Sequence, residues 1–180
     1  MTDTLSIKAA LARSERTLKL RPERGQRVYR NRAVALGGTE CRVEEAGESL
    51  TVDVGKALGG RNAGPSPSML LRSAMTSCVA IGITQWAARR DVALDRLEVA
   101  LETDVDARGQ FGLSRTVSPS FEGIRLSVTV ASPAPQAAVE AVIADSLRFS
   151  PLMDVFSNPQ AIDCRVAHAP AKFEAETGSD

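Results

Sequence analysis

The sequence predicts an α+β domain built from antiparallel strands and a long buried helix. Short runs of alternating apolar and polar residues come in groups separated by glycine-containing turns, which is typical of antiparallel hairpins. The uncharged stretch 73–88 contains several polar residues and is too short for a membrane span, so it is expected to form a buried helix. The predicted order is strand-strand-strand-helix-strand-strand-helix-strand, with no internal repeat and no alternating strand–helix units.

Composition restricts the chemistry of the chain. Its 180 residues are 43% hydrophobic, enough for one core, and 22 basic residues balance 22 acidic ones, which argues against a surface generally coated by polyanions. The one histidine, His168, excludes multi-histidine metal sites and is the only imidazole available as a base. Three cysteines without paired spacing favour a reducing compartment. With no signal-peptide pattern, we expect a cytoplasmic protein without a membrane segment.

Residues 1–30 are predicted to form a basic N-terminal helix and arm, with the helix over 4–17. From residue 1 to 36, nine Lys/Arg minus three Asp/Glu give +6, so the rest of the chain carries −6. No helix-turn-helix, aromatic stacking pattern or zinc finger accompanies the arginines that could contact phosphates. We therefore expect a solvated arm, or an arm packed on a second subunit, and no nucleic-acid partner. The arginines concerned are Arg21, Arg24, Arg27 and Arg30.

The next segment predicts an antiparallel meander of three short strands. The strands are expected over 32–36, 41–45 and 49–54, with Gly37-Gly38 and Ala46-Gly47 as the turns between them. A glycine-rich loop, 55–64, follows the third strand.

A long helix is expected to begin after this loop. Ser66 is a good N-cap, Pro67 suits the first helical turn, and the basic pair Arg89-Arg90 complements the carbonyl end. Since most positions outside the apolar face are also uncharged, the helix is predicted to be buried on more than one side. The residues of that face are Leu71, Ala74, Met75, Cys78, Gly82 and Trp86.

The second half of the chain completes the domain. Alternation predicts strands over 97–105 and 124–130, separated by turn residues, and the prolines Pro133 and Pro135 open a second helix. A short helical turn to Phe156, a last strand over 161–166 and a polar tail, 169–180, are expected after it. The predicted organisation is thus the arm, one domain over 31–168, and the tail.

Two features could carry chemistry, and each also has an ordinary structural interpretation. Cys78 lies in mid-helix, where nothing local supplies a base or a cation to form thiolate, so by pattern it resembles a small buried hydrophobe. The loop GGRNAGPSP could present backbone N–H groups to an anion at a helix start. It lacks the Lys-Ser/Thr of a Walker motif and is not GxGxxG.

A zinc site is a weaker alternative. Cys164 and His168 are four residues apart, and Cys41 and Cys78 raise the number of possible soft ligands to four. Only one pair is close in sequence, whereas zinc ligands usually come as two close pairs. An ordinary buried Cys164 and a surface His168 are favoured, and no metal or cofactor is expected.

The run from Leu58 to Arg90 resembles the OsmC/Ohr family, specifically its OsmC-like branch. In that family a glycine-rich loop leads into N/S-P-E-x-L at the start of a central helix that carries the reactive cysteine. Here Ser66-Pro67-Ser68-Met69-Leu70 occupies that position, and Cys78 lies at the spacing of the reactive cysteine. A weaker similarity extends over about 30–166 and includes the Ser150-Pro151 corner and Ser157-Asn158-Pro159.

The resemblance implies a two-layer fold and an intertwined homodimer with two equivalent sites at the interface. It also implies reduction of organic hydroperoxides. A thiolate attacks the peroxide and becomes a sulfenic acid, a second cysteine resolves it as a disulfide, and a dithiol such as a lipoyl protein restores it.

The sequence departs from the family at the positions that support this chemistry. Ser150 stands at the resolving cysteine, Ser68 at the glutamate, and Thr39 at the arginine that follows the glycine pair. Cys78 is therefore carried over alone as the catalytic residue. Other arginines could point into the site, but none matches the motif, namely Arg42, Arg61 and Arg72.

Two functional hypotheses remain open. In one, Cys78 is a one-cysteine thiol peroxidase or sensor, weakened relative to its relatives and resolved by an external thiol or a lipoyl-type reductant. In the other, the chain is a non-catalytic relative that binds a small apolar molecule or has a structural role.

Overall fold

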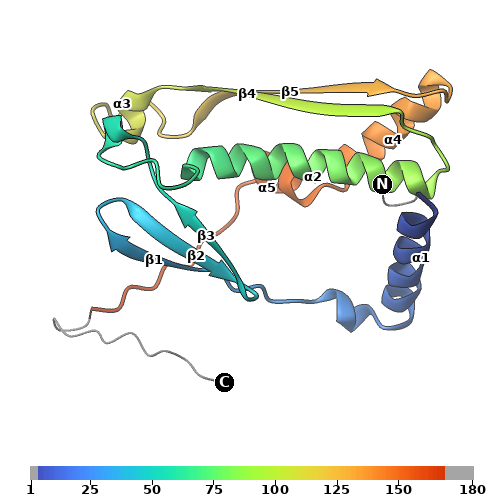
Figure 1. Cartoon of the computed structure of the whole chain (residues 1–180), viewed down its shortest axis with the longest axis horizontal. Coiled ribbons are helices and arrows are strands. Elements are labelled where there is room, and N and C mark those ends of the chain that lie inside the picture. Colours follow the sequence, from blue (N-terminus) through green and yellow to red (C-terminus); the bar gives the residue numbers. More distant parts are fainter. Residues whose placement is uncertain (1–3, 169–180) are drawn as a thin grey trace.

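The computed structural model describes residues 4–168 and has mixed α+β architecture with antiparallel sheets, as predicted (Figure 1). The predicted polar tail lies outside the described residues. The elements are α1 (Thr4–Leu20), η1 (Pro22–Gly25), β1 (Arg32–Gly37), β2 (Glu40–Glu45), β3 (Glu48–Val52), η2 (Lys56–Leu58), α2 (Pro67–Arg89), β4 (Arg96–Val105), α3 (Ala107–Gln110), β5 (Phe121–Ala131), α4 (Gln136–Arg148) and α5 (Pro151–Ser157).

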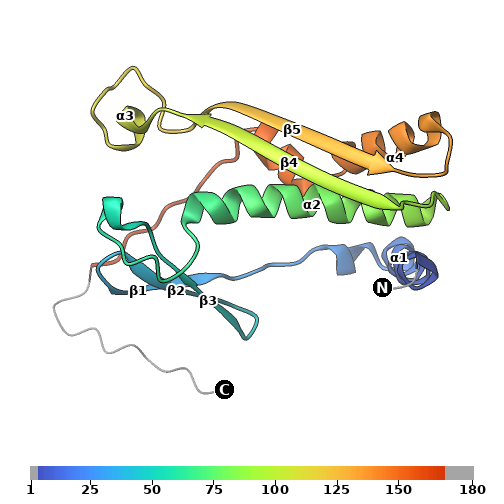
Figure 2. The ribbon, with the colours of Figure 1, turned by 45° about the horizontal axis from the view of Figure 1, so that its top comes forward.

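The core lies between the β4–β5 ribbon and the helices beneath it (Figure 2). The two strands pair antiparallel, with Val99 opposite Val128, and the alternating apolar side chains of the ribbon pack on α2 and α4. Val79 and Ile83 of α2 and Val142 of α4 are fully buried there. Each such side chain contributes roughly 1.5–3 kcal/mol of hydrophobic stabilisation.

The first three strands form the predicted meander, in the order β1-β2-β3 (Figure 1). Val43 of β2 lies opposite Ala33 on one side and Leu50 on the other. The β2–β3 turn places Ala46 at φ 51 and Gly47 at φ 86, so a left-handed conformation is required at both positions. Few side chains of this sheet are buried within the chain, and it stands apart from the helical layer in Figures 1 and 2.

The central helix α2 begins and ends where the sequence predicts. The hydroxyl of Ser66 accepts a hydrogen bond from the backbone N–H of Met69 at 3.3 Å, and Pro67 occupies the first turn. Along most of its length α2 is buried on one side only in the described chain, however, because Ile81 is 58% exposed and Leu71 is exposed as well. Burial on more than one side is therefore not confirmed.

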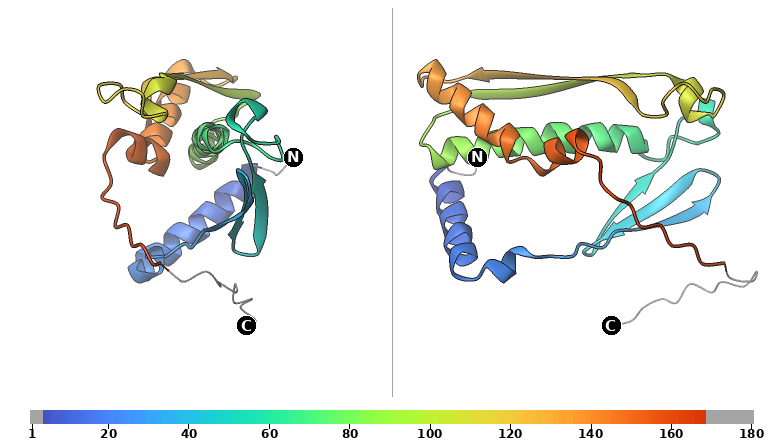
Figure 3. Two further views of the ribbon diagram at one scale, coloured as in Figure 1. Left: turned by 90° about the vertical axis from the view of Figure 1, so that its left-hand side faces the viewer. Right: turned by 180° about the vertical axis from the view of Figure 1, so that it is seen from behind.

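The N-terminal helix α1 packs against the C-terminal end of α2 in its own chain (Figure 3). Lys8 forms an ion pair with Asp91, and Glu15 forms one with Arg89 at 3.0 Å. The helix continues to Leu20, three residues beyond the predicted end. The arginines of the predicted arm, from Arg21 to Arg30, follow this helix and are exposed in the described chain.

The predicted last strand, 161–166, is wrong for the described chain. Residues 159–168 form no regular element and are exposed; Ile162 is 89% and Val166 90% exposed. The alternation is present, but within the described residues no neighbouring strand pairs with it, and an extended segment without ladder hydrogen bonds is not a strand. The prediction of a buried Cys164 fails for the same reason, since its side chain is exposed.

Candidate functional site

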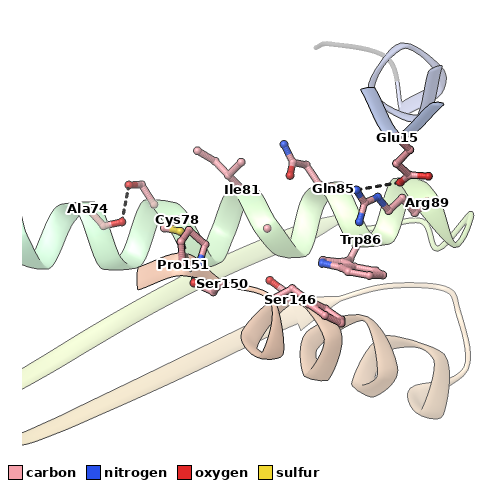
Figure 4. A pocket seen from close by; sticks show the side chains of 13 residues that line it. Glu15, Ala74, Cys78, Ile81, Gln85, Trp86, Arg89, Ser146, Ser150 and Pro151 are labelled. Atoms are coloured by element: carbon pink, nitrogen blue, oxygen red, sulfur yellow. Dashed lines mark hydrogen bonds and ion pairs between the residues drawn. The ribbon is translucent and has the colours of Figure 1, made fainter. Parts of the chain in front are cut away.

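A cavity of about 860 Å³ lies between α2 and the α4–α5 corner, with α1 at one end (Figure 4). Its lining is largely apolar and includes Cys78, Ile81 and Trp86 from α2. Phe149 and Pro151 contribute from the corner that follows α4. The predicted reactive cysteine thus lines a cavity suited to an apolar molecule.

A single stripe of α2 forms one wall of this cavity. Cys78, Gly82, Gln85 and Arg89 follow the spacing i, i+4, i+7, i+11, which returns to the same helix face after three turns. Eleven residues at 1.5 Å each separate the first from the last by about 16 Å along the axis. The thiol and the guanidinium therefore mark opposite ends of the wall.

At the thiol end, Ser150 lies beside Cys78. The Sγ and Oγ atoms are 3.6 Å apart, and Ser150 is buried. The same hydroxyl oxygen caps α5 by accepting a hydrogen bond from the backbone N–H of Met153 at 3.3 Å. Because the oxygen accepts there, its own hydrogen can be donated to Cys78 Sγ, so the serine can stabilise sulfur charge but cannot form a disulfide.

The opposite end combines aromatic rings with charge. Trp86 and Phe149 stack with ring centroids 5.4 Å apart, and the guanidinium of Arg89 lies 4.6 Å from the centre of the Trp86 ring. Glu15 reaches the same guanidinium from α1 (Figure 4). Arg89 Nε is buried without a hydrogen-bond partner, so this cation retains a donor that is not used.

Between the two ends, Gly82 lets α4 approach α2 closely. A Cβ atom at this position would lie 2.6 Å from Ser146 Oγ, which is far inside contact distance. Ser146 is among the residues that line the cavity but is only 2% exposed, and its buried hydroxyl has no hydrogen-bond partner in the described chain. A buried, unsatisfied hydroxyl costs free energy, so the fold tolerates an unfavourable group here.

The glycine-rich loop has a different role from the phosphate loop considered above. The buried carboxylate of Asp53 accepts hydrogen bonds from the Thr39 hydroxyl at 2.6 Å and from the backbone N–H groups of Val54, Arg61 and Ala63 at 2.8, 2.8 and 3.1 Å. The Thr39 hydroxyl, followed by the loop N–H groups, holds the pKa of Asp53 well below its usual range. The loop thus folds around an anion that the chain supplies itself.

Asp53 is a structural residue that sequence reasoning missed. The signal is a carboxylate directly after β3, two residues before the glycine-rich loop. Thr39, at the family's arginine position, is bound to this carboxylate rather than to the cavity.

The remaining predicted residues lie elsewhere. Ser68 is exposed in the first turn of α2, and Cys41 lies in β2 outside the cavity lining. Arg61 forms an ion pair with Glu40, and neither Arg42 nor Arg72 lines the cavity. Among the side chains that line it, all of which the structure describes, Arg89 is the only Lys or Arg.

The four soft ligands considered for zinc do not come together. Cys164 and His168 are exposed near the end of the described chain, whereas Cys41 and Cys78 lie in β2 and α2. Over residues 4–168, no group of three or more His, Cys, Asp or Glu side chains is arranged to hold a metal ion. Within the same residues, no helix is long and apolar enough to cross a membrane.

One comparison with known proteins gives a family and another gives a fold. The model of the family described as OsmC-like protein matches residues 59–165, more than half of the chain. No curated protein matches. The structure is similar to that of an OsmC-like protein from Mycoplasma pneumoniae, with a TM-score of 0.62 and 15% identity over 74% of this chain and 90% of that one.

Two further solved structures show the same fold. An OsmC-like protein of unknown function from Vibrio cholerae gives a TM-score of 0.55 and 9% identity over 72% of this chain and 93% of that one. An organic hydroperoxide resistance protein from Elizabethkingia anophelis gives a TM-score of 0.51 and 15% identity over 74% of this chain and 91% of that one.

Proposed function

Because the chain belongs to the OsmC-like protein family, we propose that it reduces or senses organic hydroperoxides through the thiol of Cys78. The observation that carries this proposal is the position of Cys78 in the lining of a largely apolar cavity, with the Ser150 hydroxyl 3.6 Å from its sulfur. An apolar lining suits the organic part of a hydroperoxide, and a thiol is the group that its O–O bond oxidises.

The proposed cycle needs one cysteine of the protein. The Cys78 thiolate attacks a peroxide oxygen, the O–O bond breaks, and the alcohol leaves after taking up a proton, so sulfur becomes sulfenic acid. An external thiol then forms a mixed disulfide and releases water. A second external thiol breaks that disulfide and returns Cys78 to its reduced form. A dithiol of the lipoyl type can supply both thiols.

We propose that this activity is weaker than that of relatives with a complete site. Ser150 cannot resolve the sulfenic acid, and Ser68 and Thr39 occupy the positions of the supporting glutamate and arginine. Arg89 is about 16 Å from Cys78 along α2, so it contributes little stabilisation to the thiolate. The hydroxyl of Ser150 remains as a hydrogen-bond donor to the sulfur.

Non-catalytic ligand binding is the second candidate. The observation that favours it is the apolar cavity itself, which extends well beyond Cys78 to Trp86 and Phe149. In this case Cys78 would only line a binding site, and hydroperoxides would oxidise its thiol no faster than an ordinary thiol.

We also propose that the chain works as an intertwined homodimer. Large apolar side chains of α2, including Met69, Leu71 and Ile81, are exposed in the described chain. The open β1–β3 sheet and the extended segment 159–168 offer backbone groups to a second copy. Two expectations from the sequence remain predictions. One is the division of the chain into an arm, 1–30, and one domain, 31–168, and the other is a cytoplasmic location. Light scattering after size-exclusion chromatography tests the dimer.

A turnover assay distinguishes the two candidate functions. tert-Butyl hydroperoxide is mixed with catalytic amounts of protein and an excess of dihydrolipoamide, and peroxide consumption is followed. The peroxidase hypothesis predicts consumption above the uncatalysed rate that Cys78→Ser abolishes and that Cys164→Ser, which removes an exposed thiol, leaves unchanged. Equal rates for the parent protein and Cys78→Ser would reject peroxidase activity and favour ligand binding.

A further inference from the structure

We propose that a second cavity, between α1 and the η1 turn that follows it, binds the phosphate chain of a small di- or triphosphate through three arginine side chains. This cavity has a volume of about 350 Å³, and its cations are Arg13 of α1, Arg24 of η1 and Arg27 just after η1. It shares no lining residue with the cavity that contains Cys78. The proposal therefore goes beyond the proposed function and does not depend on it.

Pro22 ends α1 and starts the turn that forms the cavity. A proline lacks the backbone N–H that would continue the helix and disfavours helical geometry at the residue before it, which here has φ −141 and ψ 75. The turn η1 then lies beside the C-terminal end of α1 (Figure 3). A Cβ atom at Gly25 of this turn would lie 3.4 Å from Leu18 Cδ2 of the helix. The close approach places Arg24 and Arg27 next to the last turns of α1.

The side of α1 that lines this cavity is not the side that docks on α2. Arg13, Ser14 and Thr17 share the lining side. Lys8 and Glu15, which form the ion pairs with Asp91 and Arg89, lie on the other side of the helix. At 3.6 residues per turn, the mean directions of the two sets are about 160° apart. Docking on α2 thus fixes the helix and leaves its lining side open.

Positive charge is concentrated in this cavity without a counter-charge. The lining contains three arginines and neither Asp nor Glu, and Glu23 of η1 is not part of it. In the part of the chain that the structure describes, none of the three guanidinium groups forms an ion pair with a carboxylate. Guanidinium groups that share a concavity repel one another, so an anion with several charges is the species that relieves this repulsion.

A phosphate chain is the anion that this set of donors suits. Each guanidinium offers paired N–H groups to two oxygens of a phosphoryl group, and a di- or triphosphate presents such oxygens in a row. The exposed Ser14 hydroxyl adds a donor, whereas the Thr17 hydroxyl already donates to the backbone carbonyl of Arg13 at 2.9 Å. The volume suits a small molecule. Because the lining has no aromatic side chain on which a base could stack, a nucleic acid is the less favoured occupant.

Isothermal titration calorimetry of the full-length protein, without divalent cations, tests the site with inorganic triphosphate and with ATP. We expect both to bind at least tenfold more tightly than inorganic phosphate, because only a chain of phosphates can reach several guanidinium groups at once. The affinity should fall as salt is added, since the arginines are exposed. Equal affinities would show that the phosphate chain alone is recognised, and tighter binding of ATP would show that its organic part contributes; both support the proposal.

Charge-matched variants separate this cavity from a general attraction of anions to the basic arm. Arg13→Gln and Arg24→Gln should each weaken triphosphate binding about three- to fivefold, and the double variant at least tenfold. The matched control is Arg16→Gln, which removes the same charge from the same helix at an exposed position outside the lining. It should change the affinity by less than about twofold, because exposed charges act weakly at a distance.

Three results would overturn the proposal. The first is triphosphate binding no more tightly than phosphate, and the second is Arg16→Gln weakening it as much as Arg13→Gln. The third is a single-stranded RNA of about ten nucleotides binding more than tenfold more tightly than triphosphate at the same salt concentration, which would indicate a nucleic-acid arm instead. Circular dichroism establishes that each variant is folded. A protein without peroxidase activity would leave the proposal intact, because Cys78 does not line this cavity.

Discussion

A methyl group added at Gly82 tests how closely α2 approaches Ser146 of α4, through its effect on the free energy of unfolding. Gly82→Ala improves the intrinsic preference of α2 for helix by about 1 kcal/mol. The new Cβ would lie 2.6 Å from Ser146 Oγ, however, and forced overpacking costs roughly 1–3 kcal/mol. We therefore expect Gly82→Ala to lower the free energy of unfolding by about 1 kcal/mol.

Removal of the hydroxyl should reverse the sign of this effect. Ser146→Ala deletes a buried group that has no partner, which should raise the free energy of unfolding by about 1 kcal/mol. With the clash gone, Gly82→Ala then retains its helical benefit. The double variant should be about 2 kcal/mol more stable than the parent, so the coupling between the two positions is also about 2 kcal/mol.

The assay is urea unfolding followed by Trp86 fluorescence, at one protein concentration because assembly changes apparent stability. For a chain of this size, 2 kcal/mol corresponds to a rise in Tm of about 4–8 °C. Strictly additive effects of the two substitutions would refute the close approach of Gly82 to Ser146 Oγ.

Three other predictions concern the loop, the core and the site. The pKa of Asp53 is lowered in the folded chain, so the stabilising effect of its carboxylate is present above about pH 4 and is lost as the pH falls further. Asp53→Asn should therefore make the free energy of unfolding less dependent on pH below about pH 4. An unchanged pH dependence would contradict this. Ile83→Ala should cost about 2–5 kcal/mol in urea unfolding, because Ile83 is fully buried; a loss below 1 kcal/mol would contradict the core. Ser150→Cys should form a disulfide with Cys78 after one equivalent of hydroperoxide, detected by the loss of two thiols. Persistence of both thiols would contradict a reactive Cys78 thiol beside position 150.

Local signals were sufficient for the elements that position the site. Ser66 and Pro67 specify the start of α2 through capping and backbone geometry within one turn, and both act in the structure as predicted. Alternation found the β4 and β5 strands because each pairs with its neighbour in the same chain. The same rule failed over 161–166, because an extended segment becomes a strand only where another strand meets it.

The site was only partly predictable for a similar reason. Cys78 was predicted as a site residue from the family resemblance, and the structure adds that its side chain lines a cavity. The pairing of Glu15 with Arg89 depends on how α1 docks, and the contact between Gly82 and Ser146 depends on how α4 crosses α2. Such contacts join residues far apart in sequence, where spacing and propensity carry no information.

We propose that Cys78 is a reactive thiol in the cavity between α2 and the α4–α5 corner. The most direct measurement compares Cys78 with Cys164 in the same molecule, by trapping sulfenic acid at successive times after a low dose of organic hydroperoxide and mapping the labelled peptides. Cys164 is the more exposed thiol and serves as the internal reference. We expect Cys78 to be oxidised faster than Cys164; oxidation of Cys164 at an equal or greater rate would show that Cys78 is not a specially reactive thiol.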